Sequence, residues 1–153
     1  MLERQLCFAV YSTMLAINKA YQPLLENLGL TYSQYLAMLV LWEGGDLTVK
    51  QIGERLFLDS GTLTPLLKRL EAMGLVERAR DPGDERRVRL TVTAKGHALH
   101  REAQPVPAQI AAAMGRPPED LKALRKDLRR IRNALLAARA AKPGKGESSH
   151  KSA

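Results

Sequence analysis

The chain has 153 residues, of which 45% are hydrophobic, and its formal net charge is +8. That length is typical of one domain, and the hydrophobic share excludes a wholly disordered chain. The positive charge favours a polyanionic partner, with nucleic acid as the first candidate and an anionic membrane surface as the second. We find no secretory signal and no run of the roughly 18 apolar residues that a membrane span needs, so we expect a cytoplasmic protein.

The first predicted element is a long helix over residues 2–28. Apolar side chains recur there at steps of three and four, which places them in one stripe along a helix. Pro23 lies inside the pattern and predicts a bend or break, and Gly29 punctuates the end. The stripe consists of Leu6, Val10, Met14, Ile17, Tyr21, Leu24 and Leu28.

Three shorter helices are predicted next, over residues 31–43, 48–56 and 60–73. Apolar residues at helical spacing indicate each of them, and glycines follow the first and the third. Asp59 and Ser60 are both good caps for the third helix, because their side chains can accept hydrogen bonds from its unpaired N–H groups.

The pattern then changes from helix to strand. Residues 75–80 are typical of one strand, and residues 88–92 alternate between apolar and polar side chains. The four residues at 81–84, Asp-Pro-Gly-Asp, favour a turn between the two strands. We therefore expect a β-hairpin with an arginine-rich tip.

From Thr93 the chain is again predicted to be helical, with an interruption near Pro105 and Pro107. The last helix spans residues 118–141, and its apolar positions form a seam that suits packing against another helix. Residues 142–153 form a basic tail that we expect to be disordered from its composition. The seam consists of Leu121, Leu124, Leu128, Ile131, Leu135 and Ala138.

This order of helix, short helix, helix and basic hairpin is that of a winged helix-turn-helix. The expected fold class is therefore mainly α with a small β-hairpin wing. The helix at 60–73 can insert its amino-terminal residues into a major groove about 12 Å wide, and an arginine at the wing tip suits a narrow minor groove. A helical domain with a solvated hairpin is the alternative. The predicted DNA-binding residues are Ser60, Thr62, Thr64, Lys68, Arg69, Arg86 and Arg87.

The segment DSGTLTPLLKRLEAMGLVERARDPGDERRVRLTVTAKG resembles the recognition helix and wing of the MarR family of bacterial regulators. The resemblance covers residues 48–100 closely. It implies double-stranded operator DNA as partner, Arg86 in the minor groove, and Asp84 as the residue that helps to hold the wing arginine. It also implies a homodimer held by the first and last helices, which would read a pseudo-palindrome.

The resemblance also predicts how the chain is divided. We expect an amino-terminal dimerisation and sensor helix, a DNA-binding domain, carboxyl-terminal dimerisation helices and the tail, over residues 1–30, 31–92, 93–141 and 142–153. The apolar seam supports the dimer independently, because one chain of this length has few elements left to cover it.

Cys7 is the only cysteine, so no intrachain disulfide can form. The segments QLCFAVYSTM, AYQPLL and LGLTYSQYLAMLVLWE resemble the organic-hydroperoxide-resistance regulator (OhrR) branch of the family, in its one-cysteine form. The resemblance implies that organic hydroperoxide oxidises Cys7 and that the repressor then leaves DNA. It also implies that Tyr11, Tyr21 and Tyr32 form hydrogen bonds with this sulfur across the dimer.

Helical geometry supports part of this interpretation. Cys7 and Tyr11 are four residues apart and share a helix face. Tyr21 lies about 21 Å further along a straight helix, so it can reach only the Cys7 of an antiparallel partner. The reaction with peroxide needs a Cys7 thiolate. The helix amino terminus and Arg4 favour this anion, and Glu3 opposes it. Peroxide would give a sulfenic acid, which must meet a small thiol, a backbone nitrogen or more oxidant.

Several alternatives remain open. Cys7 could be a small buried hydrophobe, and the tyrosines could pack an interface. The protein could be a repressor that a small phenolic ligand releases, a cysteine peroxidase, or an architectural DNA protein. We expect no enzyme, because a resolving cysteine and a catalytic loop are missing, and we expect no cofactor. His97 and His100 are three apart but lack further ligands, so no metal site is expected.

Overall fold

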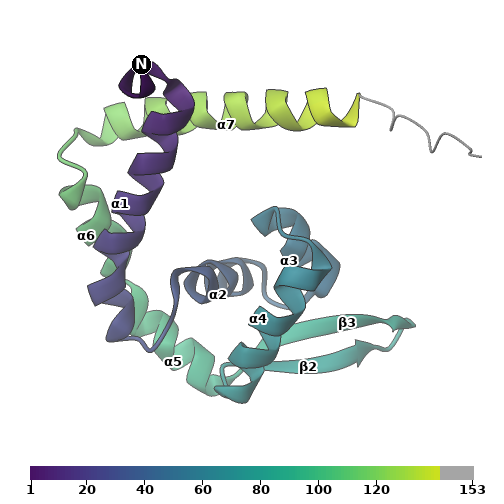
Figure 1. Ribbon diagram of the computed structural model, residues 1–153. Helices are drawn as coiled ribbons and strands as arrows, with labels where there is room; N and C mark the ends of the chain where they lie inside the picture. Colours follow the sequence, from purple (N-terminus) through teal and green to yellow (C-terminus); the bar gives the residue numbers. More distant parts are fainter. Residues whose placement is uncertain (142–153) are drawn as a thin grey trace, which may run out of the picture. The chain divides into compact units, whose positions relative to one another are not determined.

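The computed structural model describes residues 1–141, and the tail expected at 142–153 lies outside this part of the chain. The chain divides into two compact units, one over Met1–Ala113 and one that begins at Met114. Within the described residues, the first unit holds the three strands and every helix except the last (Figure 1). A search of the described helices finds none that is long and apolar enough to cross a membrane.

The amino-terminal segment is a short 3-10 helix, η1 (Leu2–Arg4), followed by the long helix α1 (Leu6–Glu26). The two are separated by Gln5, whose backbone is extended. The helix continues through Pro23, so the expected break does not occur. Leu25, two residues later, is buried in the core, and this packing holds the last turn in place despite the missing N–H group.

Three helices follow, as expected: α2 (Tyr32–Gly44), α3 (Val49–Leu56) and α4 (Ser60–Ala72). Each begins at a side chain that accepts a hydrogen bond from a backbone N–H group of the first turn. The accepting oxygens belong to Thr31, Thr48 and Asp59. These caps fix where each helix begins, and for α4 they determine which residues stand at its amino terminus.

The wing is a three-stranded antiparallel sheet in the order β1-β3-β2. The expected hairpin is confirmed as β2 (Val76–Asp81) and β3 (Asp84–Val92). A further strand, β1 (Leu47–Thr48), was not predicted, because two residues are too few to show an alternating pattern. Leu47 pairs with Leu90, and this pairing fastens the wing to the segment between α2 and α3.

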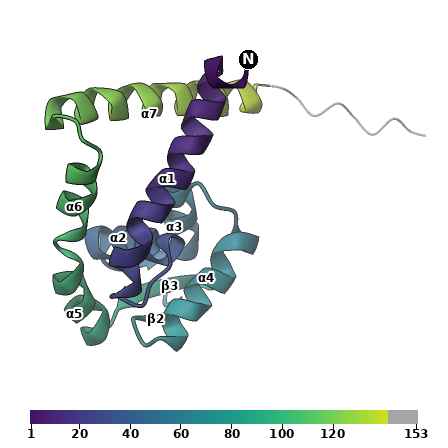
Figure 2. The ribbon, with the colours of Figure 1, turned by 60° about the vertical axis from the view of Figure 1, so that its left-hand side comes forward.

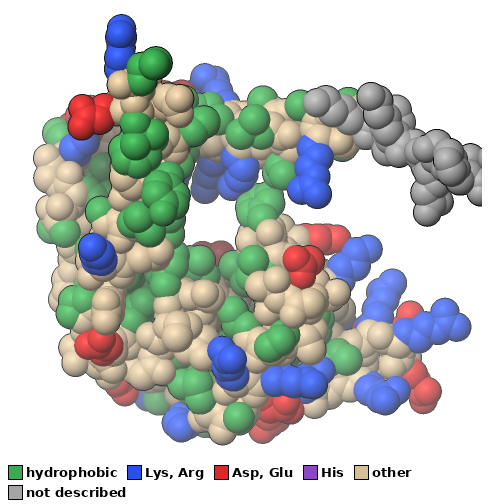
Figure 3. All heavy atoms as spheres, viewed as in Figure 1, with side chains coloured by type: hydrophobic (Ala, Val, Ile, Leu, Met, Phe, Trp, Pro, Cys, Tyr) green, Lys and Arg blue, Asp and Glu red, His purple; other side chains and the backbone are tan. Residues whose placement is uncertain are grey.

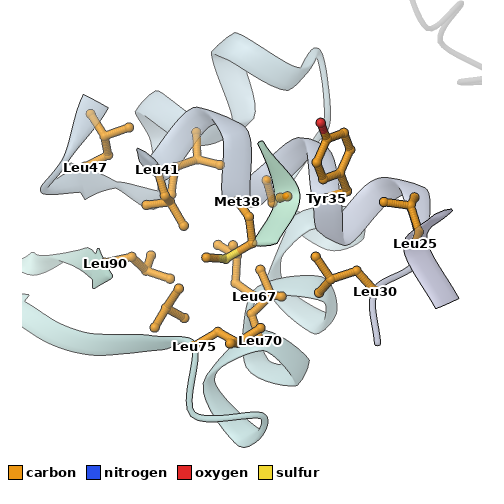
Figure 4. Packing of buried hydrophobic residues seen from close by; sticks show 14 of the residues in the cluster. Leu25, Leu30, Tyr35, Met38, Leu41, Leu47, Leu67, Leu70, Leu75 and Leu90 are labelled. Carbon is orange, nitrogen blue, oxygen red and sulfur yellow. The ribbon is translucent and has the colours of Figure 1, made fainter. Parts of the chain in front are cut away.

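The core of the first unit surrounds α2, which contacts α1, α3, α4, α5 and β3 (Figures 2 and 4). Tyr35, Met38 and Leu41 are fully buried on this helix, and Leu67 and Leu90 reach them from α4 and β3. The expected mainly helical fold with a small β wing is therefore confirmed.

After the wing the chain forms α5 (Ala94–Ala103) and α6 (Val106–Ala113), interrupted where the prolines predict. The helix α6 lies beside α1 (Figures 1 and 2). The second unit contains α7 (Pro118–Ala140), which has no buried residue. The division into functional domains drawn above stays a prediction.

Candidate nucleic-acid interface and redox site

The amino terminus of α4 is the most open part of the helix-turn-helix. Ser60, Gly61 and Thr62 are exposed, whereas Leu63 and Leu67 are buried on the opposite side of the same helix. Asp59 Oδ1 accepts a hydrogen bond from the Thr62 N–H at 2.8 Å, and this bond holds the pKa of Asp59 below its ordinary value. The first turn of α4 therefore presents small polar side chains and backbone to solvent.

The other predicted helix residues continue this surface towards the middle of α4. Lys68 and Arg69 are exposed, and Thr64 is half-buried. Because the buried leucines hold the opposite side of α4 against the core, these side chains cannot turn inward. A duplex that meets the helix amino terminus would place its phosphates near the two cations.

The tip of the wing carries a second group of cations, and Lys and Arg side chains gather at the outer end of the hairpin (Figure 3). Arg86 and Arg87 are both exposed there. Asp84 Oδ1 accepts a hydrogen bond from the backbone N–H of Arg86 at 3.0 Å, and its Oδ2 lies 3.6 Å from Arg87 Nε. Asp84 thus holds the main chain of Arg86 and the side chain of Arg87.

A third wing arginine, which the sequence reasoning missed, anchors the sheet. Arg89 Nε donates to both carboxylate oxygens of Asp46 at 3.0 and 2.9 Å, and Arg89 Nη1 donates to Asp81 Oδ2 at 3.4 Å. Asp46 lies in the segment between α2 and β1, 43 residues earlier in the chain. No local pattern connects residues so far apart, so only the alternation of polar and apolar residues in β3 could have suggested an outward-facing Arg89.

Cys7 is the second residue of α1 and is exposed in the single chain. It stands in the first turn, where unpaired backbone N–H groups give a positive potential. Tyr11 is also exposed, and its ring lies 6.3 Å from that of Phe8, measured between ring centroids. The possibility that Cys7 is buried within its own chain's core does not hold.

The other predicted sensor tyrosines form a cluster at the far end of α1. The ring centroid of Tyr21 lies 4.7 Å from that of Tyr32 and 5.8 Å from that of Tyr35. Burial raises the pKa of Tyr21 to about 12, with smaller contributions from the other two phenols. Burial also raises the pKa of Tyr32 and of Tyr35. Tyr35 was not predicted, although its spacing of three from Tyr32 places both on one face of a helix.

The structure therefore separates the proposed sensor residues into two groups. Cys7 and Tyr21 belong to the same unbroken helix, and 14 residues of helix span about 21 Å. The tyrosine cluster of a chain cannot reach the sulfur of that chain. The two groups can meet only between two chains.

Two histidines of the described part of the chain, His97 and His100, were considered as metal ligands in the sequence. His97 is exposed, and His100 stacks on Trp42 with ring centroids 4.6 Å apart. A search of residues 1–141 finds no group of three or more His, Cys, Asp or Glu side chains that could hold a metal ion.

Residues 19–102 match the family described as "Transcriptional regulator SarA/Rot". The chain is 51% identical over 136 residues to the HTH-type transcriptional regulator TtmR of Methylorubrum extorquens, covering 89% of this chain and 70% of that protein. It is 49% identical over 127 residues to the organic hydroperoxide resistance transcriptional regulator of Bacillus subtilis, covering 83% and 86% of the two chains. The chain belongs to the MarR/SarA family of transcriptional regulators.

Solved structures of similar proteins support this assignment to the family. Reduced AbfR bound to DNA is 36% identical to this regulator, with a TM-score of 0.72 over 88% of this chain and 94% of that one. A mutant of MarR from E. coli, complexed with operator DNA, shares the fold alone at 22% identity, with a TM-score of 0.74 over 80% and 90%. The chain is thus a DNA-binding regulator of the MarR/SarA family with a winged helix-turn-helix, and this family is not enzymatic.

Proposed function

We propose that this regulator is a peroxide-sensing repressor. It binds a pseudo-palindromic operator as a homodimer while Cys7 is reduced, and it releases the operator when organic hydroperoxide oxidises Cys7. The observation that carries the proposal is the placement of an exposed Cys7 and a tyrosine cluster at opposite ends of α1. The similarity to an organic hydroperoxide resistance regulator supports the choice of oxidant.

A second copy of the chain is the partner that the exposed apolar residues favour. The helices α1 and α7 each expose large hydrophobic side chains at helical spacing, and those of α1 are visible in Figure 3. Soluble monomers rarely leave such stripes uncovered. A dimer would cover them on both helices. The exposed residues are Leu6, Val10, Met14, Leu124, Leu128, Ile131 and Leu135.

In an antiparallel pairing of α1 with its copy, the tyrosine cluster of one chain lies near Cys7 of the other. The hydroxyl of Tyr21, with a pKa of about 12, stays protonated at neutral pH and can donate a hydrogen bond to the sulfur. Tyr11, one turn from Cys7, and Tyr32, in ring contact with Tyr21, complete the proposed surroundings of the thiolate.

The proposed chemistry is a two-electron oxidation. The Cys7 thiolate attacks the outer oxygen of the hydroperoxide, the O–O bond breaks, and after protonation the products are a sulfenic acid and an alcohol. A small thiol can then displace the hydroxyl group as water and leave a mixed disulfide on Cys7. The thiol must come from outside, because the chain has one cysteine.

The proposed contacts with DNA come from α4 and from the wing. Ser60, Thr62 and Thr64 would meet base edges in the major groove, and Lys68 and Arg69 would meet phosphates. Arg86 and Arg87 would contact the minor groove and its phosphates, with Asp84 holding both in place.

The solved forms of AbfR define what the experiment must separate. AbfR has been solved as an overoxidized protein bound to DNA, as a reduced protein bound to DNA, and with a disulfide formed. Oxidation of the protein and loss of DNA are therefore two different measurements. For this regulator, the fate of the sulfenic acid has to be controlled by adding or omitting a thiol.

The test is fluorescence anisotropy of the reduced protein on DNA from upstream of its own gene. Cumene hydroperoxide is titrated with and without a small thiol, hydrogen peroxide is compared, and Cys7→Ser is the control. We expect the wild type to be released by the organic hydroperoxide at a lower dose than by hydrogen peroxide, and Cys7→Ser to stay bound. If both proteins stay bound under every condition, the proposal is wrong, and release by phenolic ligands is tested next.

A further inference from the structure

Phe57 has an unusual backbone conformation. It ends α3 with a φ of 57°, in the left-handed region. Among residues 1–141, every other positive φ belongs to a glycine. A β-carbon in this region is crowded by the neighbouring carbonyl oxygen, so glycine or asparagine is the usual residue at such a helix end.

The side chain of Phe57 is also in an unfavourable environment, because 56% of it is exposed. An aromatic ring gains stability by leaving water, and an exposed ring forgoes much of that gain. Neither the backbone nor the solvent favours phenylalanine at this position. Strained, exposed residues of this kind are concentrated at functional sites.

Backbone hydrogen bonds and a helix cap hold the turn on both sides of Phe57. The backbone N–H groups of Phe57 and Leu58 both donate to the carbonyl oxygen of Gly53. Leu58 is half-buried against the core, and Asp59 then caps α4. The turn is therefore fixed on both sides of Phe57 by its neighbours.

The ring stands beside the proposed DNA-binding surface. Phe57 lines an open groove together with Val49 of α3 and with Ser60 and Leu63 of α4. It is three residues before Ser60, the first residue of α4. When the amino terminus of a recognition helix enters the major groove, the turn before it comes close to the wall of that groove. Lys50 and Glu54, which form an exposed ion pair at 3.9 Å between Lys50 Nζ and Glu54 Oε1, also line this groove.

We infer that Phe57 is a DNA-contacting residue, whose ring makes an apolar contact with the operator beside α4. The groups available to it are the methyl group of a thymine and the carbon atoms of a deoxyribose. The inference rests on the operator binding described under the proposed function, but it does not depend on Cys7 or on any oxidant.

The test compares Phe57→Asn with the wild type and with Phe57→Tyr, which keeps the ring. All three proteins are reduced, and their affinity for DNA from upstream of the gene is measured by fluorescence anisotropy alongside their Tm. We expect Phe57→Asn to raise Tm by a few degrees, because strain is relieved, and to weaken DNA binding by about tenfold. Phe57→Tyr should bind within about twofold of the wild type.

A second arm replaces thymine by uracil throughout the DNA, which removes the methyl groups. If the ring contacts a methyl group, uracil weakens the wild type more than it weakens Phe57→Asn. If it contacts deoxyribose, uracil affects both proteins equally while Phe57→Asn still binds more weakly.

Two outcomes would overturn the inference. Binding of Phe57→Asn within about twofold of the wild type would show that the ring does not contact DNA. A fall in Tm of several degrees would show that the ring is part of the turn's packing. Because no peroxide is added, failure here is distinct from failure of Cys7 as the sensor, and Phe57→Asn should still be released by cumene hydroperoxide.

Discussion

At the scale of single residues, Arg89 links segments that are distant in the sequence. Its guanidinium joins Asp46, before β1, to Asp81, at the end of β2. The hydrogen bond from Gly83 N–H, together with Arg89, keeps the pKa of Asp81 below its ordinary value. The wing therefore has a fixed direction relative to α2, which a hairpin joined only by its strands would lack.

We predict that Arg89→Gln weakens operator binding without changing the secondary structure. The substitution removes the ion pairs of Arg89 with Asp46 and Asp81, so the wing is held less firmly in its direction relative to α2. We therefore expect the affinity for operator DNA to fall about threefold to fivefold. Anisotropy titration and circular dichroism measure the two effects. Arg80→Gln, on the adjacent strand, is the matched control, and an equal loss of affinity there would point to general electrostatics rather than to the anchor.

Tyr21 gives a prediction about pH. Its pKa is raised to about 12 in the folded chain from an ordinary value of 10.0. Between these values the unfolded chain loses the proton first, so the folded state binds more protons and its stability falls as pH rises. Below pH 10 both states keep the proton and the contribution is constant.

We expect the free energy of unfolding to fall between pH 10 and pH 12, with about 1 kcal/mol of the fall due to Tyr21 after allowance for solvent screening. Urea titrations at several pH values, on the wild type and on Tyr21→Phe, isolate this contribution. Identical pH profiles for the two proteins would contradict the prediction.

At the scale of elements, the start of α5 packs unusually closely on the end of the wing. A β-carbon on Gly96 would collide with the carbonyl oxygen of Leu75 and lie 2.6 Å from Val92 Cγ1. Trp42 Nε1 also donates to the Gly96 carbonyl oxygen at 3.0 Å. Only glycine allows this contact between helix and strand.

Gly96→Ala should therefore destabilise the protein by about 2 kcal/mol, because backbone must move to admit the methyl group. Thermal unfolding measures the loss. His97→Ala, at the exposed neighbouring position, should change stability by less than about 0.5 kcal/mol. If both variants unfold at the wild-type temperature, the close packing is not required.

The elements that could be predicted from the sequence are those with local signals. Thr31, Thr48 and Asp59 mark helix starts through bonds to residues three positions on, and these caps appear in the structure. The strand β1 has no local signal, because it exists only by pairing with Leu90 and Arg89. The contact between Tyr21 and Tyr35 likewise depends on how α1 packs against α2.

At the scale of the whole molecule, the exposed apolar seam of α7 favours a dimer. Leu128 and Ile131 remain exposed on it, and none of its residues is buried. We expect Leu128→Glu to dissociate the dimer, because a charge would be placed in the apolar seam. Operator affinity should then fall at least about tenfold, since a monomer holds one half-site.

Sedimentation velocity at several concentrations measures the mass. Lys126→Glu is the matched control. It places the same charge on α7, but residues two apart on a helix do not share a face, so position 126 lies outside the seam that contains Leu128. It should remain a dimer. A Leu128→Glu protein that sediments as the wild type would contradict the seam as the dimer contact.

Cys7 and Tyr21 stand towards opposite ends of one helix, and this has a consequence for mixed dimers. If each sensor is completed by the other chain, two defective chains can restore one working site between them. A mixed dimer of Cys7→Ser and Tyr21→Phe chains would contain one site with both substitutions and one site with neither. Purified away from the Cys7→Ser homodimers, which stay on DNA, such a mixed dimer would regain a reaction with hydroperoxide that neither parent homodimer gives.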